Sequence, residues 1–173
     1  MACLRREDKG MLGKKMEAAL NGQLNAELFS SYLYLSMAAY FKSTKTQGMA
    51  KWMKVQAKEE EVHGMKFFDY IADRGGRVRL AAIEAPESEW ASPLAAFEAV
   101  YAHEQKVTGL INGLVKLAEQ EKDAETGTFL QWFVKEQEEE EETADAVVQR
   151  LKAVKADAQG LREADAALGQ RGG

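Results

Sequence analysis

The chain has 173 residues, of which 46% are hydrophobic and 29% charged, and its formal net charge is −5. This length suits one domain with a sizeable core, and the single cysteine, Cys3, excludes a disulfide framework and a cysteine-rich zinc module. The acidic balance argues against nucleic acid as a partner, and no apolar run reaches the roughly 20 residues that a membrane span needs. Because the first ten residues lack the apolar region of a secretory signal, we expect a cytoplasmic protein.

The positions of the prolines predict two long helical halves. Pro86 and Pro93 are the only prolines, and a proline breaks a helix interior because it removes a donor and clashes with the preceding turn. Apolar residues recur at helical spacing on both sides of this pair. The predicted helices run from about 11 to 41, 48 to 74, 93 to 121 and 124 to 155, with a short C-terminal helix at about 161 to 168. Signals for helix ends and starts stand at Gly75-Gly76, Ser92-Pro93 and Asp123.

The lengths of the connections predict the topology. Short joins make the first two helices, and the last two long helices, antiparallel neighbours. The connection at 77–91 is long enough, at about 3.3 Å per extended residue, to run the roughly 45 Å of a 30-residue helix. We therefore expect an all-α four-helix bundle with one long crossover between helices two and three, plus a short C-terminal helix. The predicted parts are a flexible N-terminal tail at 1–10, the bundle at 11–155, and the C-terminal helix and tail at 156–173.

Each predicted helix carries an inward stripe of residues spaced three and four apart. All four stripes are apolar at their ends and carry metal-capable side chains near their middle. These side chains are Glu27 on the first helix, Glu60 and His63 on the second, Glu104 on the third, and Gln137 and Glu140 on the fourth. Gln56 also lies on the second stripe, and Tyr34 lies on the first.

Four buried carboxylates at one level need compensation. Each unpaired carboxylate taken out of water costs several kcal/mol, and no lysine or arginine lies on these stripes near that level. Either several of the carboxyls are protonated or cations neutralise them, and two divalent cations would balance four charges. Oxygen ligands with one imidazole, from His63, suit iron, manganese or zinc, and ligand softness does not choose among them.

The acidic run at 136–142 predicts a further cation site. Six of its seven residues are glutamate. Helical geometry places Gln137 and Glu140 on the stripe, and Glu136 and Glu139 beside it. The outward-facing residues are predicted to be Glu138, Glu141 and Glu142. Because Glu59 similarly flanks Glu60, a cation bound among Glu59, Glu136, Glu139 and Glu140 would explain the acidic flank.

Two surface features are also predicted. His103 lies about 100° round the third helix from Glu104, so we expect it at the surface. The segment 28–37 is apolar nearly all round its helix, and its outer face is therefore expected to meet a second subunit. The methionines are interpreted as core residues, and no haem is expected.

Motifs along about residues 16–155 repeat a known pattern. They are Asn25-Ala26-Glu27, Tyr32-Leu33-Tyr34, Glu59-Glu60-Glu61-Val62-His63, Phe68-Asp69-Tyr70, Arg74-Gly75-Gly76, Ser92-Pro93-Leu94, Glu104 and the segment 129–140. Together they resemble the non-haem ferritins of bacteria and archaea. The resemblance implies a subunit that oxidises Fe(II) to Fe(III) with dioxygen or peroxide. It also implies storage of the product as a ferric oxide-hydroxide mineral, inside a hollow shell of twenty-four copies.

The resemblance also implies roles for individual residues. Glu27, Glu60 and His63 match ligands of a first iron, while a bridging Glu60 with Glu104 and Glu140, and Gln137 alongside, match those of a second. A third iron site is matched by Glu59, Glu136, Glu139 and Glu140. Tyr34 and Trp132 match aromatic residues close to this centre. The chain departs from the family in its fifth helix, where 160–168 carries arginine, glutamate and alanine in place of bulky apolar residues.

Neighbouring families fit less well. Bacterioferritins carry a second E-x-x-H motif on the fourth helix, which here is Gln137-x-x-Glu140, and rubrerythrins need more cysteines. Two other interpretations stay open. One is a di-metal carboxylate oxidase without a storage shell, which iron loading would distinguish. The other is a metal-free helical scaffold with protonated glutamates, whose thermal stability would not respond to metal.

Overall fold

The computed structural model describes residues 10–154 and 157–172, and this part of the chain folds into five helices without strands. The helices are α1 (Lys14–Ser43), α2 (Gln47–Asp73), α3 (Pro93–Glu121), α4 (Ala124–Val154) and α5 (Ala158–Leu168). None of these helices is long and apolar enough to cross a membrane. The predicted all-α bundle is confirmed. Most of the predicted N-terminal tail, Cys3 and the predicted helix end at Lys155 lie outside the described residues.

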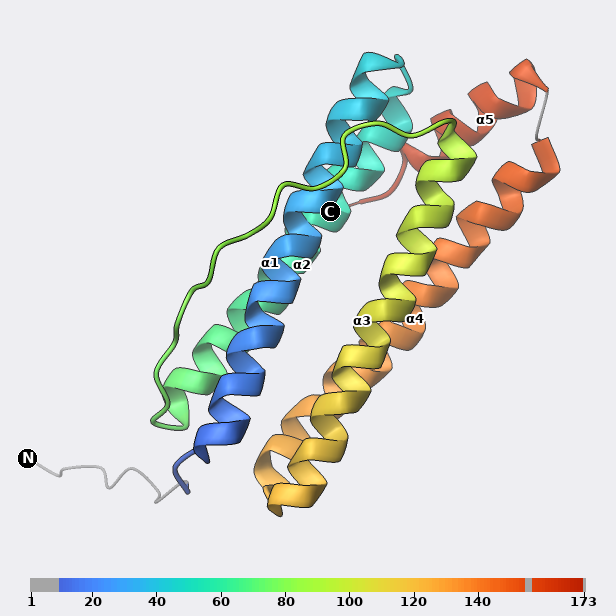
Figure 1. The fold of residues 1–173 in the computed structure, drawn as a ribbon. Coiled ribbons are helices and arrows are strands. Elements are labelled where there is room, and N and C mark those ends of the chain that lie inside the picture. Colours follow the sequence, from blue (N-terminus) through green and yellow to red (C-terminus); the bar gives the residue numbers. More distant parts are fainter. Residues whose placement is uncertain (1–9, 155–156, 173) are drawn as a thin grey trace, which may run out of the picture.

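The four long helices form two antiparallel hairpins, α1 with α2 and α3 with α4 (Figure 1). Because the green connection returns along the bundle before α3 begins, α2 and α3 run in the same direction (Figure 1). The predicted crossover is thereby confirmed. Its consequence is that residues near the middle of all four helices lie at a common height.

The three helix boundaries with predicted local signals are confirmed, whereas α1 begins three residues later than predicted, at Lys14, and α5 three residues earlier, at Ala158. Ser92 Oγ accepts a hydrogen bond of 3.1 Å from the backbone N–H of Ala95 at the start of α3. Asp123 does the same for Thr126 at the start of α4, at 3.0 Å. Gly75, with φ +69°, ends α2 in the left-handed conformation that glycine adopts without strain.

The crossover packs along the outer side of α1. Asn21 Nδ2 donates to the carbonyl of Arg77 at 3.0 Å, and Ser36 Oγ donates to that of Glu87 at 2.6 Å. The sequence assigned the outer face of this helix to a second subunit. The structure shows that the crossover of the same chain covers part of that face. Tyr32 and Leu35 stay 50% and 48% exposed on this helix.

The core consists of two apolar clusters. One includes Tyr34, Phe41 and Phe97, and the other includes Phe67 and Phe133. In each long helix, buried polar residues lie in sequence between the residues of the two clusters. We call this zone the polar layer; its members are Glu27, Glu60, His63, Glu104, Gln137 and Glu140.

A glycine at the start of α2 lets α5 dock on the bundle. A Cβ added to Gly48 would lie 1.7 Å from the carbonyl oxygen of Asp165 in α5. We expect Gly48→Ala to displace α5, exposing Ala164 and Leu168, and to lower the unfolding free energy by about 1–3 kcal/mol. Chemical denaturation, with limited proteolysis before α5, checks this.

The matched control is Gly113→Ala, since a Cβ there meets nothing within 4 Å. This change favours helix and is expected to be neutral or stabilising by up to about 1 kcal/mol. Equal stability of the two variants would contradict the docking of α5 through Gly48.

Candidate metal centre

The polar layer brings together one or two side chains from each long helix. Its six members are all buried, with at most 7% of any residue exposed. The burial that the stripes predicted is therefore confirmed for all six. The helical periodicity places them inward, and the crossover brings α2 and α3 to the same height.

Glu27, Glu60 and His63 form a first group with metal-binding geometry. Each offers one ligand atom, and these atoms lie within 4.8 Å of one another. His63 Nδ1 lies 3.5 Å from Glu60 Oε2. Glu27 Oε2 is buried and has no hydrogen-bond partner among the described residues. A buried carboxylate oxygen without a partner is costly unless a cation or proton binds there, so this group can hold a cation.

His63, Glu136 and Glu140 form a second group, whose ligand atoms also lie within 4.8 Å of one another. His63 Nε2 is 3.6 Å from Glu136 Oε1. The two ring nitrogens of His63 therefore face carboxylates on opposite sides. The two groups share this imidazole, so the polar layer offers adjacent cation positions.

Glu104 is held by neighbours rather than included in either group. It accepts hydrogen bonds from the Tyr34 hydroxyl and from Gln137 Nε2, the latter at 3.2 Å. Tyr34 is fully buried, so its ring fixes the donor that holds this carboxylate. The arrangement orients Glu104 within the polar layer.

Two glutamines in the centre received no role from the sequence. Gln23 Nε2 donates to Glu27 Oε1 at 2.7 Å. Gln56 Nε2 donates to Glu140 Oε2 at 2.7 Å and to Glu60 Oε1 at 3.4 Å. Each glutamine stands four residues before a buried glutamate on its own helix, and this spacing was the available signal.

Burial dominates the electrostatics of the carboxyls. Burial, followed by the charge of Glu60, raises the pKa of Glu27 to about 8. Burial, followed by Glu104, raises the pKa of Glu140 to about 7. The pKa values of Glu60 and Glu104 are also raised, chiefly by burial. Among residues 10–154 and 157–172, no lysine or arginine lies within ion-pair distance of these four, so their charges lack a compensating cation.

The acidic flank is only partly gathered. Glu136 faces His63, and Glu59 forms an ion pair of 2.5 Å with Arg171. Glu139 is not brought to either group: its side chain is 63% exposed and pairs with Lys135 at 3.5 Å.

The predicted outward direction of Glu141 is wrong. This residue is half-buried and accepts a hydrogen bond of 2.5 Å from the Thr108 hydroxyl. The reason is that α3 packs on this side of α4, which the wheel of a single helix does not indicate.

The prediction that His103 lies at the surface is also wrong. The ring is half-buried, shares a hydrogen bond of 2.8 Å between its Nε2 and Ser30 Oγ, and packs edge-on against Tyr34. Burial, followed by the charge of Lys106, lowers its pKa to about 4, so the imidazole is neutral at pH 7. Since α1 covers this side of α3, His103 supports the tyrosine that holds Glu104.

A cavity of about 490 Å³ reaches the centre between α2 and α4. Glu59, His63, Trp132 and Glu136 line it, together with lysines of α2. The Trp132 ring contacts that of His63, with 5.4 Å between the ring centroids. This cavity gives the second group a route to the surface.

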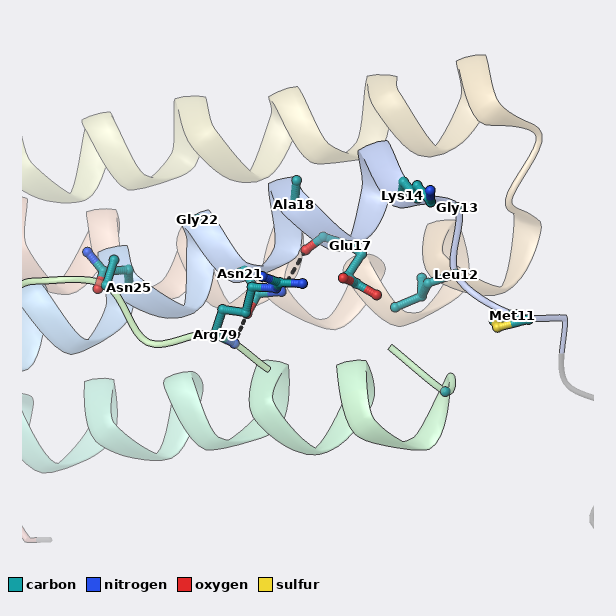
Figure 2. A pocket seen from close by; sticks show the side chains of 12 residues that line it. Met11, Leu12, Gly13, Lys14, Glu17, Ala18, Asn21, Gly22, Asn25 and Arg79 are labelled. Carbon is teal, nitrogen blue, oxygen red and sulfur yellow. Dashed lines mark hydrogen bonds between the residues drawn. The ribbon is translucent and has the colours of Figure 1, made fainter. Parts of the chain in front are cut away.

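A larger cavity, of about 1080 Å³, lies elsewhere, between the start of α1 and the crossover. Figure 2 shows Asn21 there, hydrogen-bonded to the backbone of Glu17 and Arg79. No predicted site residue lines this cavity. It does not serve the polar layer.

A family model, curated sequences and a solved structure that resemble this chain all come from ferritins. A family model described as a ferritin-like domain matches residues 17–154. A bacterial non-haem ferritin of Bacteroides fragilis (strain 638R) is 43% identical over 161 residues, which are 93% of this chain and 100% of the relative. One from Staphylococcus aureus (strain USA300) is 38% identical over 161 residues, 93% of this chain and 97% of the relative. A crystal structure of an open-pore ferritin from the hyperthermophilic archaeon Archaeoglobus fulgidus has 52% identity and a TM-score of 0.92, covering 93% of this chain and 98% of its own.

The raised pKa values predict that the metal-free protein loses stability as the pH rises. Between the ordinary glutamate value of 4.5 and about 7 for Glu140 or about 8 for Glu27, the folded state holds protons that the unfolded state has released. The unfolding free energy then falls by on the order of 1 kcal/mol per pH unit for each carboxyl. Chemical denaturation from pH 5 to 9 measures this.

Zn(II) and a matched variant provide the controls. Zn(II) is expected to remove the decline at pH 8, because it binds the ionised carboxylates. Glu27→Gln, which cannot ionise, is expected to make the decline less steep in the absence of metal, because it removes one of the carboxyls that cause it. A metal-free stability that rises from pH 5 to 8 would contradict the assignment of buried, protonated carboxyls.

Proposed function

The chain belongs to the ferritin-like family, and on this premise we propose that it oxidises Fe(II) to Fe(III) at the polar layer, with dioxygen or peroxide as oxidant. The product is stored as a ferric oxide-hydroxide mineral inside a hollow shell of twenty-four copies. The observation that carries the proposal is the burial of four glutamates and one histidine at one level, without a lysine or arginine paired to these glutamates in the described chain.

Two Fe(II) ions are the substrates of this centre. Glu27, Glu60 and His63 hold the first, and Glu60, Glu104 and Glu140 hold the second, with Gln137 alongside. Two divalent ions balance the four carboxylates, and the oxygen-rich donor set with one imidazole suits iron. Binding displaces the protons that burial retains on Glu27 and Glu140, so iron uptake is coupled to proton release.

The residues also favour the oxidised product. Each Fe(II) gives one electron to the oxidant, so that dioxygen is reduced to peroxide, or peroxide to water, with protons taken from solvent. Fe(III) gains more than Fe(II) from anionic oxygen ligands in a buried site, because the Coulomb energy grows with the ion charge. Tyr34 holds Glu104 in position through its hydroxyl, and Gln56 does so for Glu140.

The acidic flank provides a way out of the centre. Glu136, Glu140 and Glu59 form a third cation position at the edge of the polar layer. Glu139, which now pairs with Lys135, would have to turn to join them. Proximity of His63, Glu136 and Glu140 and the cavity that reaches them support this route. Oxidised iron leaves the centre along it toward the mineral.

Substitution of the shared ligands tests the centre. Glu60→Ala and His63→Ala are each expected to lower the rate of Fe(II) oxidation by about 100-fold or more, since each removes a donor at the junction of the two iron positions. Ultraviolet absorbance of Fe(III) in stopped flow measures the rate. The control is Glu138→Ala, an exposed glutamate of the same run, which should oxidise iron as the unchanged chain does. Unchanged rates in both ligand variants would remove the mechanism.

Iron loading and particle size test storage. Electron microscopy is expected to show a hollow particle that becomes electron-dense when Fe(II) is added in air. The iron bound per subunit should exceed by far what the centre and its flank hold. Saturation at two or three iron ions per subunit would instead identify a di-metal oxidase without storage.

A further inference from the structure

The C-terminal tail returns to α2 from a fixed starting point. Asp165 Oδ1 of α5 accepts a hydrogen bond of 2.8 Å from the backbone N–H of Met49, and Lys51 Nζ donates to the Gly169 carbonyl at 2.9 Å. Figure 1 shows the red tail running from α5 back toward the hairpin of α1 and α2. Because both contacts hold the tail on the first turns of α2, the next residues reach the middle of that helix.

Arg171 makes three defined contacts there. Its Nη1 donates to Gln56 Oε1 at 2.7 Å, and its Nη2 contacts Glu59 Oε2 at 2.5 Å. Its guanidinium carbon lies 4.6 Å from the centroid of the Trp52 ring. The side chain is 22% exposed. The planar guanidinium thus uses two donors and one face at once, which a lysine cannot do.

These contacts connect the tail to the polar layer. Because Arg171 occupies Oε1 of Gln56, the amide is oriented with its Nε2 toward Glu140 and Glu60. Glu59, the other partner of Arg171, lines the cavity that reaches His63 and Glu136. A single side chain from the tail therefore orients Gln56 and neutralises Glu59, an acid of the cavity between α2 and α4, which we call the outlet.

We propose that Arg171 is a tethered cation that competes with a third metal ion for Glu59. This rests on the third cation position proposed above. A divalent ion bound to Glu59 Oε2 and a guanidinium in contact with the same oxygen repel each other, so binding of the ion requires Arg171 to leave. The tail then withdraws from Gln56 as well. Metal binding at the outlet therefore frees the Gln56 amide, whose Nε2 donates to Glu140.

Zn(II) calorimetry tests the competition with a probe that undergoes no oxidation. The unchanged protein is expected to bind two Zn(II) ions per subunit at the centre and a third more weakly. Arg171→Ala should tighten the third site by about two- to fivefold, the range for loss of a partly exposed ion pair, and leave the first two unchanged. Arg171→Lys, which retains the charge without the fork, should lie between them.

Two further variants make the result specific. Arg162→Ala removes an equal charge from α5, where Arg162 bonds to Gln159 of its own helix, and should titrate as the unchanged protein does. Glu59→Gln should weaken the third site and abolish the effect of Arg171→Ala in the double variant. A third site that is absent, unchanged or weaker in Arg171→Ala overturns the inference.

A second readout separates this failure from that of the proposed function. In the metal-free protein, a double-mutant cycle of Arg171→Ala and Glu59→Gln on the unfolding free energy is expected to give a favourable coupling, and saturating Zn(II) should remove it. Coupling that is absent without metal, or that persists with it, overturns the tethered cation. If the unchanged protein binds no Zn(II) at the two tight sites, the proposed iron centre is overturned instead.

Discussion

Four carboxylates buried at one height govern this molecule. The two apolar clusters on either side fix the spacing of the helices, and the carboxyls between them keep protons to pH values at which glutamate is ordinarily ionised. Hydrogen bonds from Tyr34, Gln23, Gln56 and Gln137 orient the oxygens but supply no positive charge. The same residues are therefore expected to set the pH dependence of folding and, in the proposed function, to bind the cations, because protons and metal ions compete for the same oxygens.

The crossover makes this layer possible. A short turn between α2 and α3 would make the two helices antiparallel, whereas the return of the chain along α1 makes them run in the same direction (Figure 1). Each long helix then brings its central polar residues to a common level. The crossover is held to α1 by Asn21 and Ser36, so the topology and the position of the centre depend on the same contacts.

Positive charge is placed around the centre and not within it. In the described part of the chain, Arg171 meets Glu59, Lys135 meets Glu139, and Lys66 lies over Trp132 at the outlet. This distribution leaves the four buried carboxylates without a paired lysine or arginine in the described chain, while Glu59 and Glu139 on the flank are each paired with one. The proposed passage of iron needs the flanking pairs to open, since a permanently paired acid at the outlet would oppose it.

The sequence by itself determined the helices, the crossover and the six members of the polar layer. Helical periodicity, caps and proline positions are local properties, and the burial of a stripe follows from them. The tertiary structure decided what lies beside each stripe. The half-burial of His103 and Glu141 depends on which helix packs on which side. The contact of Arg171 with Glu59 joins residues 112 positions apart and depends on where α5 docks, because no local pattern encodes the path of a tail after its helix ends.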